Sequence, residues 1–254
     1  MITKDELKDY ANLKGLTLGN AEKDYLLEIA LLLIARNTKD ELVFKGGTAL
    51  YKFYKLDRFS EDLDFSTKKS VDIDSLLKNI IKGLIRFGID SRIHGKKTTK
   101  DTVMATIRTK GPLYTGRSIT YSKIEIDINQ KSSVIMQPRI KKLVSIYPEI
   151  PTFNLLVMDV REIFAEKIRA VMTRDKARDV YDIWFLQKNI KDLDKESINK
   201  KLKYYDKKFD FKKFTESIDN KKANWKKDLK PLLRIFPKHE KIKKEITKFI
   251  KKHL

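Results

Sequence analysis

Hydrophobic and polar positions change their spacing along the chain, and these changes predict where helices give way to strands. Residues 22–37 are apolar on most faces, which is typical of a helix buried on several sides. Residues 42–44 form a short apolar run, a Lys-Gly-Gly-Thr sequence follows at 45–48, and helical composition resumes over 49–54. This pattern predicts a strand, a glycine turn and a helix.

The next segment, Ser60 to Ser66, alternates acidic and apolar residues. Alternate side chains of a strand share one face, so this segment predicts a strand that carries Asp62 and Asp64 on the same side. A helix is expected from Asp74, as its N-terminal cap, to about residue 87, with Gly88 ending it.

The middle of the chain has a period of two, and its last third has a helical period. β-branched alternation predicts a largely antiparallel sheet, with strands over residues 89–93, 103–109, 118–128 and 140–146. Helices are then expected over 159–174, where Asp159 and Glu162 have the spacing of a capping box, and over 177–189. Short helices follow in a lysine-dense region, and a basic amphipathic helix is expected over 240–254.

The succession of elements predicts an α+β fold in two domains. Residues 1–157 hold the mixed sheet with its helices, and residues 158–254 form a helical, lysine-rich domain. The length of 254 residues agrees with either two modest domains or one elaborated domain.

Composition narrows the class of protein. The chain carries 56 Lys and Arg against 35 Asp and Glu, a net charge of +21, which favours polyanionic partners such as nucleic acid. It has no cysteine and only three histidines, which excludes disulfides and thiolate metal sites and argues against a multi-histidine zinc centre. No apolar stretch is long enough to cross a membrane, and the first residues do not resemble a signal peptide, so we expect a cytoplasmic protein.

Candidate chemistry begins at the glycine turn. Gly46, Gly47 and Thr48 stand where a strand meets a helix, and backbone N–H groups at a helix N-terminus favour phosphate oxygens. The turn is therefore a candidate cradle for a triphosphate, although the same residues also suit a tight turn without a ligand.

The paired aspartates are candidate metal ligands. Asp62 and Asp64 on one strand face repel each other unless a cation lies between them, and carboxylate oxygens suit Mg²⁺. The alternative is two solvated side chains on an exposed strand. A third acid would complete a site for two metal ions, and either Glu125 or Asp127 is placed to supply it; we favour Asp127 because its side chain is shorter.

Together these motifs resemble the AbiEii/AbiGii (MenT-like) toxin family of the DNA polymerase β-type nucleotidyltransferase superfamily. The resemblance is carried by residues 44–50 (FKGGTAL), by Arg58-x-Ser60-x-Asp62-Leu63-Asp64-Phe65, by Glu166-Lys167 and by Arg178-Asp179-x-x-Asp182. It implies a nucleotidyltransferase core, bound Mg²⁺ and a nucleoside triphosphate (NTP) substrate. It also implies the toxin of a bacterial toxin–antitoxin or antiphage system, with a cognate antitoxin as partner and tRNA ends as acceptors in some relatives.

The residues of the later motif also invite an independent interpretation. Lys167 falls inside the apolar arc of its helix, so it needs an anion, which a triphosphate would supply, unless its side chain extends out to solvent. Asp179 is expected to orient Lys167, to help bind nucleotide, or only to complement the helix dipole. Asp182 is a candidate partner for Arg178 one helical turn away and, through the motif, a nucleotide-binding residue.

Other candidates have two interpretations each. Arg58 and Ser60 flank the acidic strand and either contact nucleotide phosphate or hold the turn. Aromatic residues beyond residue 200 are interleaved with lysines, which suits base stacking but more often reflects small hydrophobic cores. The last helix has a short apolar face, which argues against a role on an anionic membrane.

The sequence therefore predicts a nucleotidyltransferase that uses two Mg²⁺ ions held by Asp62, Asp64 and Asp127. Gly46, Gly47 and Thr48 would hold the β- and γ-phosphates, Lys167 would neutralise charge on the pyrophosphate, and the acceptor would be an RNA 3′ end. The alternatives are transfer to a protein or a small molecule, a phosphotransferase that uses the γ-phosphate, and a non-catalytic basic RNA-binding module.

Overall fold

The computed structural model describes residues 1–131, 133–233 and 235–254. Contacts divide the chain into two compact units. The first comprises Met1–Phe53, Glu61–Val134 and Pro138–Val157, and the second comprises Tyr54–Ser60, Ile135–Gln137 and Met158–Leu254. These units differ from the division expected at residues 157 and 158 in two short segments, 54–60 and 135–137, which pack with the helical unit.

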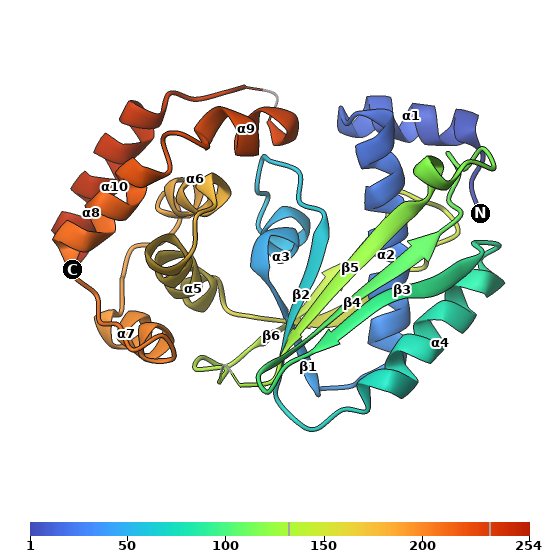
Figure 1. The fold of residues 1–254 in the computed structure, drawn as a ribbon, viewed down its shortest axis with the longest axis horizontal. Helices are drawn as coiled ribbons and strands as arrows, with labels where there is room; N and C mark the ends of the chain where they lie inside the picture. The colour runs from blue at the N-terminus through green and yellow to red at the C-terminus, as the bar shows by residue number, and fades with distance from the viewer. Residues whose placement is uncertain (132, 234) are drawn as a thin grey trace. The chain divides into compact units, whose positions relative to one another are not determined.

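The first unit is built on a mixed sheet whose strand order, in the described residues, is β3-β4-β5-β2-β1-β7-β6 (Figure 1). The central β2 pairs in parallel with β5 and antiparallel with β1. The strands are β1 (Leu42–Lys45), β2 (Asp62–Thr67), β3 (Ser91–Thr98), β4 (Thr102–Thr109), β5 (Ser122–Asn129), β6 (Arg139–Leu143) and β7 (Phe153–Val157).

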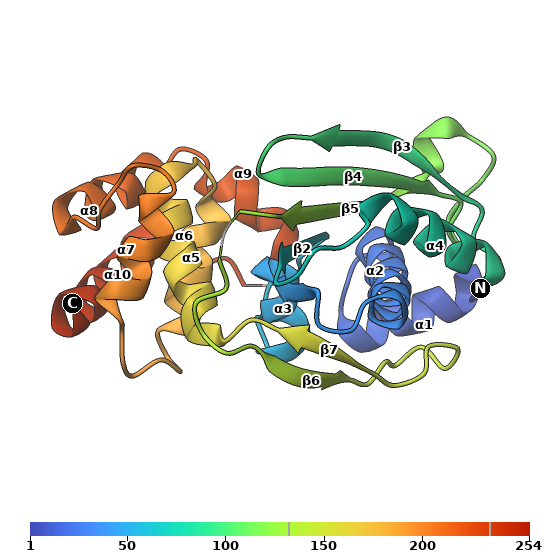
Figure 2. The same cartoon turned by 90° about the horizontal axis from the view of Figure 1, so that it is seen from below.

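In the part of the first unit that the structure describes, the α-helices are α1 (Lys4–Lys14), α2 (Leu18–Asn37), α3 (Gly46–Phe53) and α4 (Ile73–Arg86). Helix α2 packs against α1, α4 and β5, and α4 packs against β3. Figure 2 shows α1, α2 and α4 gathered on one side of the strands. Helix α2 is buried over most of its length, as its apolar sequence predicts.

Period-two alternation divides the residues of the sheet between a helix-covered face and an open face. Leu63, Phe65 and the isoleucines of β5 are buried on the helix-covered face. Asp62, Asp64 and Asp127 are half-buried on the opposite face, where the alternating pattern placed them. The fold therefore presents the acidic side chains on the side of the sheet away from α2 and α4.

Several local predictions were wrong for identifiable reasons. Asp72, not Asp74, is the N-cap of α4, and its carboxylate accepts a hydrogen bond from the Ser75 backbone N–H at 3.0 Å. Asp159 does cap the helix after β7, but the expected capping box does not form. The Glu162 carboxylate instead accepts hydrogen bonds from the backbone N–H groups of Ile135 and Met136.

The described residues of the second unit contain helices and loops but no strand. Phe214 and Trp225 are buried and serve as small-core residues, whereas Tyr204, Tyr205 and Phe211 are exposed. Its helices are α5 (Val160–Thr173), α6 (Ala177–Leu186), α7 (Lys195–Lys203), α8 (Phe211–Asn220), α9 (Trp225–Leu229) and α10 (His239–His253).

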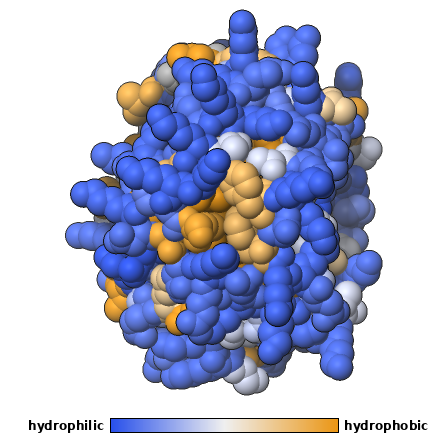
Figure 3. All heavy atoms as spheres, turned by 90° about the vertical axis from the view of Figure 1, so that its left-hand side faces the viewer, coloured by the Kyte–Doolittle hydropathy of each residue, from blue (hydrophilic) through white to orange (hydrophobic). Residues whose placement is uncertain are grey.

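Helix α10 confirms the predicted basic amphipathic helix. Ile242, Ile246 and Ile250 are buried, and the helix packs against α6 and α8, so its apolar face is used inside the protein. Figure 3 shows the side of α7, α8 and α10 as a largely hydrophilic surface around an apolar patch. Within the described ranges, we find no helix long and apolar enough to span a bilayer.

Candidate active site

The glycine turn lies directly against the carboxylate of Asp64. Strand β1 ends at Lys45 and α3 begins at the next residue, Gly46, whose φ of +75° is in the left-handed region. A Cβ atom on Gly46 would lie 2.1 Å from Oδ2 of Asp64, far inside van der Waals contact. Glycine therefore serves two purposes here, since it adopts the backbone conformation and leaves room for the carboxylate.

Thr48 connects the turn to the acidic strand. It is fully buried, and its hydroxyl donates a hydrogen bond to the backbone carbonyl oxygen of Asp62 at 2.5 Å. The hydroxyl thus fixes α3 to β2. The groups of the turn that suit phosphate are then the backbone N–H groups of Gly46 and Gly47.

Parallel pairing of β2 with β5 places the acids beside one another. Asp64 is the register partner of Asp127, and Asp62 is the register partner of Glu125. Neighbouring strands lie about 4.8 Å apart, so the Cα atoms of Asp64 and Asp127 are separated by roughly that distance. Asp127 is half-buried, whereas Glu125 is exposed.

Carboxylate oxygens are suitable ligands for a divalent cation, and strand pairing places Asp64 beside Asp127. Among the described residues, no group of three or more Asp, Glu, His or Cys side chains is arranged so that it could by itself hold a metal ion. Mg²⁺ is usually bound by one or two carboxylates together with substrate phosphates rather than by an all-protein cage. Asp64 and Asp127 supply the one or two carboxylates that such a site needs. Asp62 lies one position further along the same face.

A buried lysine accompanies the acids. Lys45 is the register partner of Asp64 on β1, so the two side chains project from the same face of the sheet. Sequence reasoning gave Lys45 no role, because it stood next to the glycines and was treated as part of the turn. Its position as the last residue of a buried strand was the available signal.

Helix α3 is held from its other end by a buried ionic cluster. Lys52 lies 2.6 Å from Asp24 and 2.5 Å from Glu28, both on α2. Burial alone would raise the pKa of Asp24, but the charges of Lys52 and Lys14 outweigh it and hold that pKa below its ordinary value. The cluster ties the glycine turn to the most buried helix of the unit, which the sequence did not indicate.

Comparison with known proteins shows which family the chain resembles. A family profile described as "Nucleotidyl transferase AbiEii toxin, Type IV TA system" matches residues 31–248, which include the glycine turn and all three acids. The chain belongs to the AbiEii nucleotidyltransferase toxin family. Membership makes it a nucleotidyltransferase of a toxin–antitoxin system. A search of curated protein sequences gave no match.

Solved structures share the fold of this AbiEii-family protein. JHP933 from Helicobacter pylori is 23% identical, with a TM-score of 0.64 over 93% of this chain and 92% of that chain. The toxin MenT4 from Mycobacterium tuberculosis, a nucleotidyltransferase, is 17% identical, with a TM-score of 0.66 over 98% of this chain and 88% of that chain. These likenesses establish a mixed-sheet nucleotidyltransferase fold.

In the AbiEii-family chain, the later motif forms a buried ionic network within the second unit. Nζ of Lys167 lies 2.8 Å from Oδ1 of Asp179 and 2.7 Å from Oδ2 of Asp182. Asp179 thus orients Lys167, one of the alternatives that the sequence left open, and the buried lysine has the anions that it needed. Roles for Lys167, Asp179 and Asp182 toward a nucleotide stay predictions.

Arg58 is fully buried in the same network. Its Nε and Nη2 donate to the two carboxylate oxygens of Asp182 at 2.6 and 2.7 Å, and its Nη1 donates to the carbonyl oxygen of Phe59. This bidentate pair supports the scaffold alternative for Arg58. Ser60 is also buried, in the chain segment that packs with the second unit, and its predicted contact with nucleotide stays a prediction.

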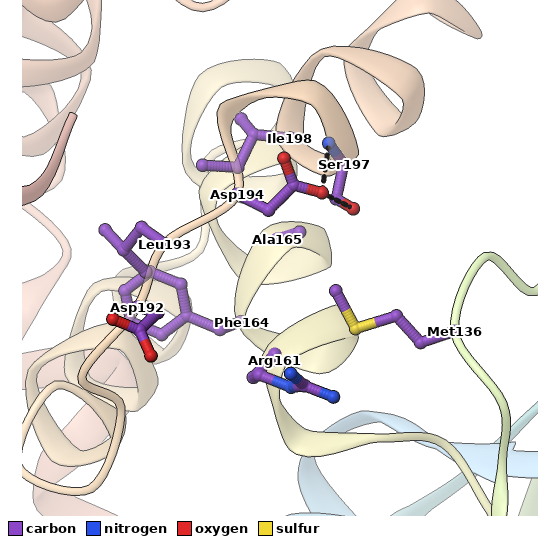
Figure 4. A pocket seen from close by; sticks show the side chains of 9 residues that line it. All are labelled: Met136, Arg161, Phe164, Ala165, Asp192, Leu193, Asp194, Ser197 and Ile198. Carbon is purple, nitrogen blue, oxygen red and sulfur yellow. Dashed lines mark hydrogen bonds between the residues drawn. The ribbon is translucent and has the colours of Figure 1, made fainter.

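A small cavity of about 120 Å³ in the second unit is separate from these residues (Figure 4). Phe164, Leu193 and Ile198 are among the apolar side chains that line it, and none of the predicted site residues does. Asp194 at its rim caps α7 by accepting hydrogen bonds from Glu196 and Ser197, so its carboxylate already has a structural role.

Acid is expected to weaken the second unit through the buried aspartates. Burial alone would raise the pKa of Asp179, but Lys167 and Arg174 hold it far below the ordinary value. A lowered folded-state pKa contributes stability that is present above the unfolded value of about 3.9 and is lost as pH falls toward the folded value. Urea unfolding of wild type and Asp179→Asn at pH 7, 4 and 3 tests this.

The stability advantage of wild type over Asp179→Asn should shrink below pH 4, with a slope approaching about 1.4 kcal/mol per pH unit. An advantage that stays constant from pH 7 to pH 3 would show that the buried charge of Asp179 does not stabilise the fold.

Proposed function

We propose that this chain transfers a nucleoside monophosphate from an NTP to the 3′ end of an RNA, with tRNA as the preferred acceptor and with Mg²⁺ as cofactor. The observation that carries the proposal is the contact of the Asp64 carboxylate with the Gly46 turn, beside the register partner Asp127. This contact supports the proposal because nucleotidyl transfer requires a metal-binding group and a phosphate-binding group close together.

Each group has a defined part in the proposed reaction. The backbone N–H groups of Gly46 and Gly47 bind phosphate oxygens of the NTP, and Asp64 and Asp127, with Asp62, hold up to two divalent cations. When bound, these cations supply Lewis-acid chemistry, lowering the pKa of the acceptor hydroxyl and balancing phosphate charge. Lys45, beside Asp64, adds a positive charge close to the substrate.

Bond changes follow from this placement. The acceptor oxygen loses its proton to solvent and forms a bond to the α-phosphorus, while the bond between the α-phosphorus and the bridging oxygen to the β-phosphate breaks. The products are an RNA extended by one nucleotide, pyrophosphate and a proton. Lys167 is proposed to balance charge on the leaving pyrophosphate, as predicted from the sequence.

The charge of the chain favours RNA among the possible acceptors. A net charge of +21 favours a phosphodiester backbone over a small molecule or most proteins. We further propose that the toxin acts in the cytoplasm, where NTPs and RNA are present, that a cognate antitoxin restrains it, and that antiphage defence is its role.

Transfer of label tests the proposal. The protein is incubated with total tRNA, Mg²⁺ and each of the four NTPs, labelled at either the α- or the γ-phosphate. We expect RNA to acquire the α-label from at least one NTP, EDTA to prevent this, and periodate oxidation of the terminal ribose to remove the acceptor. Transfer of the γ-label would instead indicate a phosphotransferase, and α-label transfer that needs no RNA would indicate a protein or small-molecule acceptor.

A further inference from the structure

Cationic and aromatic side chains gather at one end of the sheet in the first unit. The guanidinium carbon of Arg108 lies 4.9 Å from the ring centroid of Tyr121, and that of Arg92 lies 5.9 Å from the same centroid. The ring of Tyr114 lies 4.8 Å from that of Tyr121. We call these four residues, Arg92, Arg108, Tyr114 and Tyr121, the arginine–tyrosine platform.

The platform lies on the same face of the sheet as the acids. Arg92 of β3 pairs with Arg108 of β4, and Arg108 pairs with Lys123 of β5, so the three cationic side chains form a row across the sheet. Lys123 and Asp127 are four residues apart on β5, which places them on one face.

The neighbouring residues of β3 support this assignment of faces. Lys96 points to the other face, where it forms a salt bridge with Asp74 of α4 at 2.6 Å. A β-bulge between Ile93 and Gly95 separates the two residues, so Lys96 pairs with the buried Ala105, whereas Arg92 pairs with Arg108 on the face that carries the acids.

The spacing between the platform and the acids matches a short run of nucleotides. Four residues along a strand span roughly 13 Å, at about 3.3 Å per residue. Stacked nucleotides repeat at roughly 3.4 Å, so about four of them span the interval from Lys123 to Asp127. Glu125 is the exposed residue between Lys123 and Asp127 on this face, and Gly95, two strands away on β3, has no side chain there.

Arg108 also has an unused hydrogen-bond donor. Its Nε is buried but has no hydrogen-bond partner among the described residues, although buried polar groups are normally paired. A guanidinium stacked on an aromatic ring is suited to bind a phosphate oxygen through the N–H groups at its edge. Arg92 and Lys123 are exposed and can contact the same backbone.

We propose that the arginine–tyrosine platform binds the single-stranded 3′ segment of the acceptor RNA, about four nucleotides upstream of the reacting hydroxyl. This inference rests on the proposed RNA acceptor. Tyr121 and the stacked arginines offer flat surfaces to bases, and every base has a π-face, so binding is sequence-tolerant. The row of positive charge holds the phosphates and directs the strand along β5 toward Asp127.

Binding of a labelled single-stranded RNA of roughly twelve nucleotides, measured by fluorescence anisotropy without NTP or metal, tests the platform. The variant Arg92→Ala/Arg108→Ala removes two positive charges from it. The matched control Lys82→Ala/Arg86→Ala removes two from α4, on the other side of the sheet. Tyr121→Ala removes the aromatic ring, whereas Tyr121→Phe removes only the hydroxyl, so the pair distinguishes the contribution of stacking to binding from that of the hydroxyl. Circular dichroism verifies that each variant is folded.

We expect the double arginine variant and Tyr121→Ala each to bind at least about tenfold more weakly than wild type. The α4 control and Tyr121→Phe should stay within about twofold. The double arginine variant should also reduce the salt dependence of binding, by about one unit of slope for each phosphate that it no longer binds. Equal weakening of the platform variant and the α4 control, or no weakening of either, would overturn the assignment.

The same proteins separate this inference from the proposed function. Normal label transfer by wild type, with unchanged RNA binding by every platform variant, contradicts the platform alone. Specific binding that is lost only in the platform variants, without transfer by wild type, contradicts the proposed reaction and retains the platform. Failure of wild type to bind RNA, or weaker binding of RNA than of an acidic peptide, overturns the platform.

Discussion

Asp64→Asn is expected to reduce nucleotidyl transfer by about a thousandfold while leaving the fold intact. Asparagine keeps the size of the side chain, so the contact with Gly46 survives, but it removes the charge that a divalent cation requires. Losing about 4 kcal/mol of charge stabilisation in the transition state corresponds to a factor of roughly 10³, at about 1.4 kcal/mol per tenfold change. The measurement is the initial rate of α-label transfer at saturating NTP.

Glu125 supplies a matched control for this experiment. It lies on the same strand and face as Asp127, but it pairs with Asp62 and is exposed. We expect Asp127→Asn to lose transfer as Asp64→Asn does, and Glu125→Gln to stay within about threefold of wild type. The reverse pattern would make Glu125 the third acid. Undiminished transfer by Asp64→Asn would remove the metal-binding role from that residue.

Arg58→Ala is expected to have the largest effect on stability, lowering the free energy of unfolding by about 3–5 kcal/mol. Arg58 and Asp182 are both fully buried and share a bidentate pair. Removing the arginine takes the bidentate partner from a carboxylate that stays buried beside Lys167. Urea unfolding, followed by circular dichroism, measures the change.

Arg174→Ala is the control for the buried pair. Arg174 also pairs with an aspartate of the network, Asp179, but its side chain is 48% exposed, so solvent screens the interaction. We expect a loss of about 1 kcal/mol or less. If Arg58→Ala and Arg174→Ala destabilise the protein equally, burial of the Arg58 pair does not govern its contribution.

The elements that carry the site were predictable because their signals are local. The apolar run, the two glycines and the alternation of Asp62 and Asp64 with apolar residues each specify a short segment through φ requirements or strand period. Helix α10 was equally clear, since its isoleucines recur at helical spacing.

Long-range pairing was not predictable from these signals. The neighbours of β2 in the sheet are β1 and β5, and β5 is separated from β2 in sequence by α4, β3 and β4. Alternation alone left Glu125 and Asp127 equivalent, and only the register shows that Asp127 lies beside Asp64. The missed α1 and β7 are a polar surface helix and a short strand, whose patterns are weak.

For charged residues in apolar segments, the sequence predicted the need for a partner but not which residue is the partner. The buried position of Lys167 predicted that it needs an anion, but the sequence did not show which anion is nearest, and the structure supplies Asp179 and Asp182. The cluster of Lys52 with Asp24 and Glu28 joins the consecutive helices α2 and α3 through residues 24 to 28 positions apart in sequence. Such interactions depend on tertiary packing rather than on local spacing.

Binding of Mn²⁺, as a substitute for Mg²⁺, shows directly whether the paired aspartates hold a cation, and electron paramagnetic resonance measures it in the presence of a non-hydrolysable NTP analogue. If Asp64 and Asp127 hold the cation together with substrate phosphates, wild type will bind Mn²⁺ tightly only when the analogue is present. Asp64→Asn and Asp127→Asn will then lose this binding, whereas Glu125→Gln will keep it. Equal Mn²⁺ binding by wild type and Asp64→Asn would show that the acids beside the glycine turn are not the metal site.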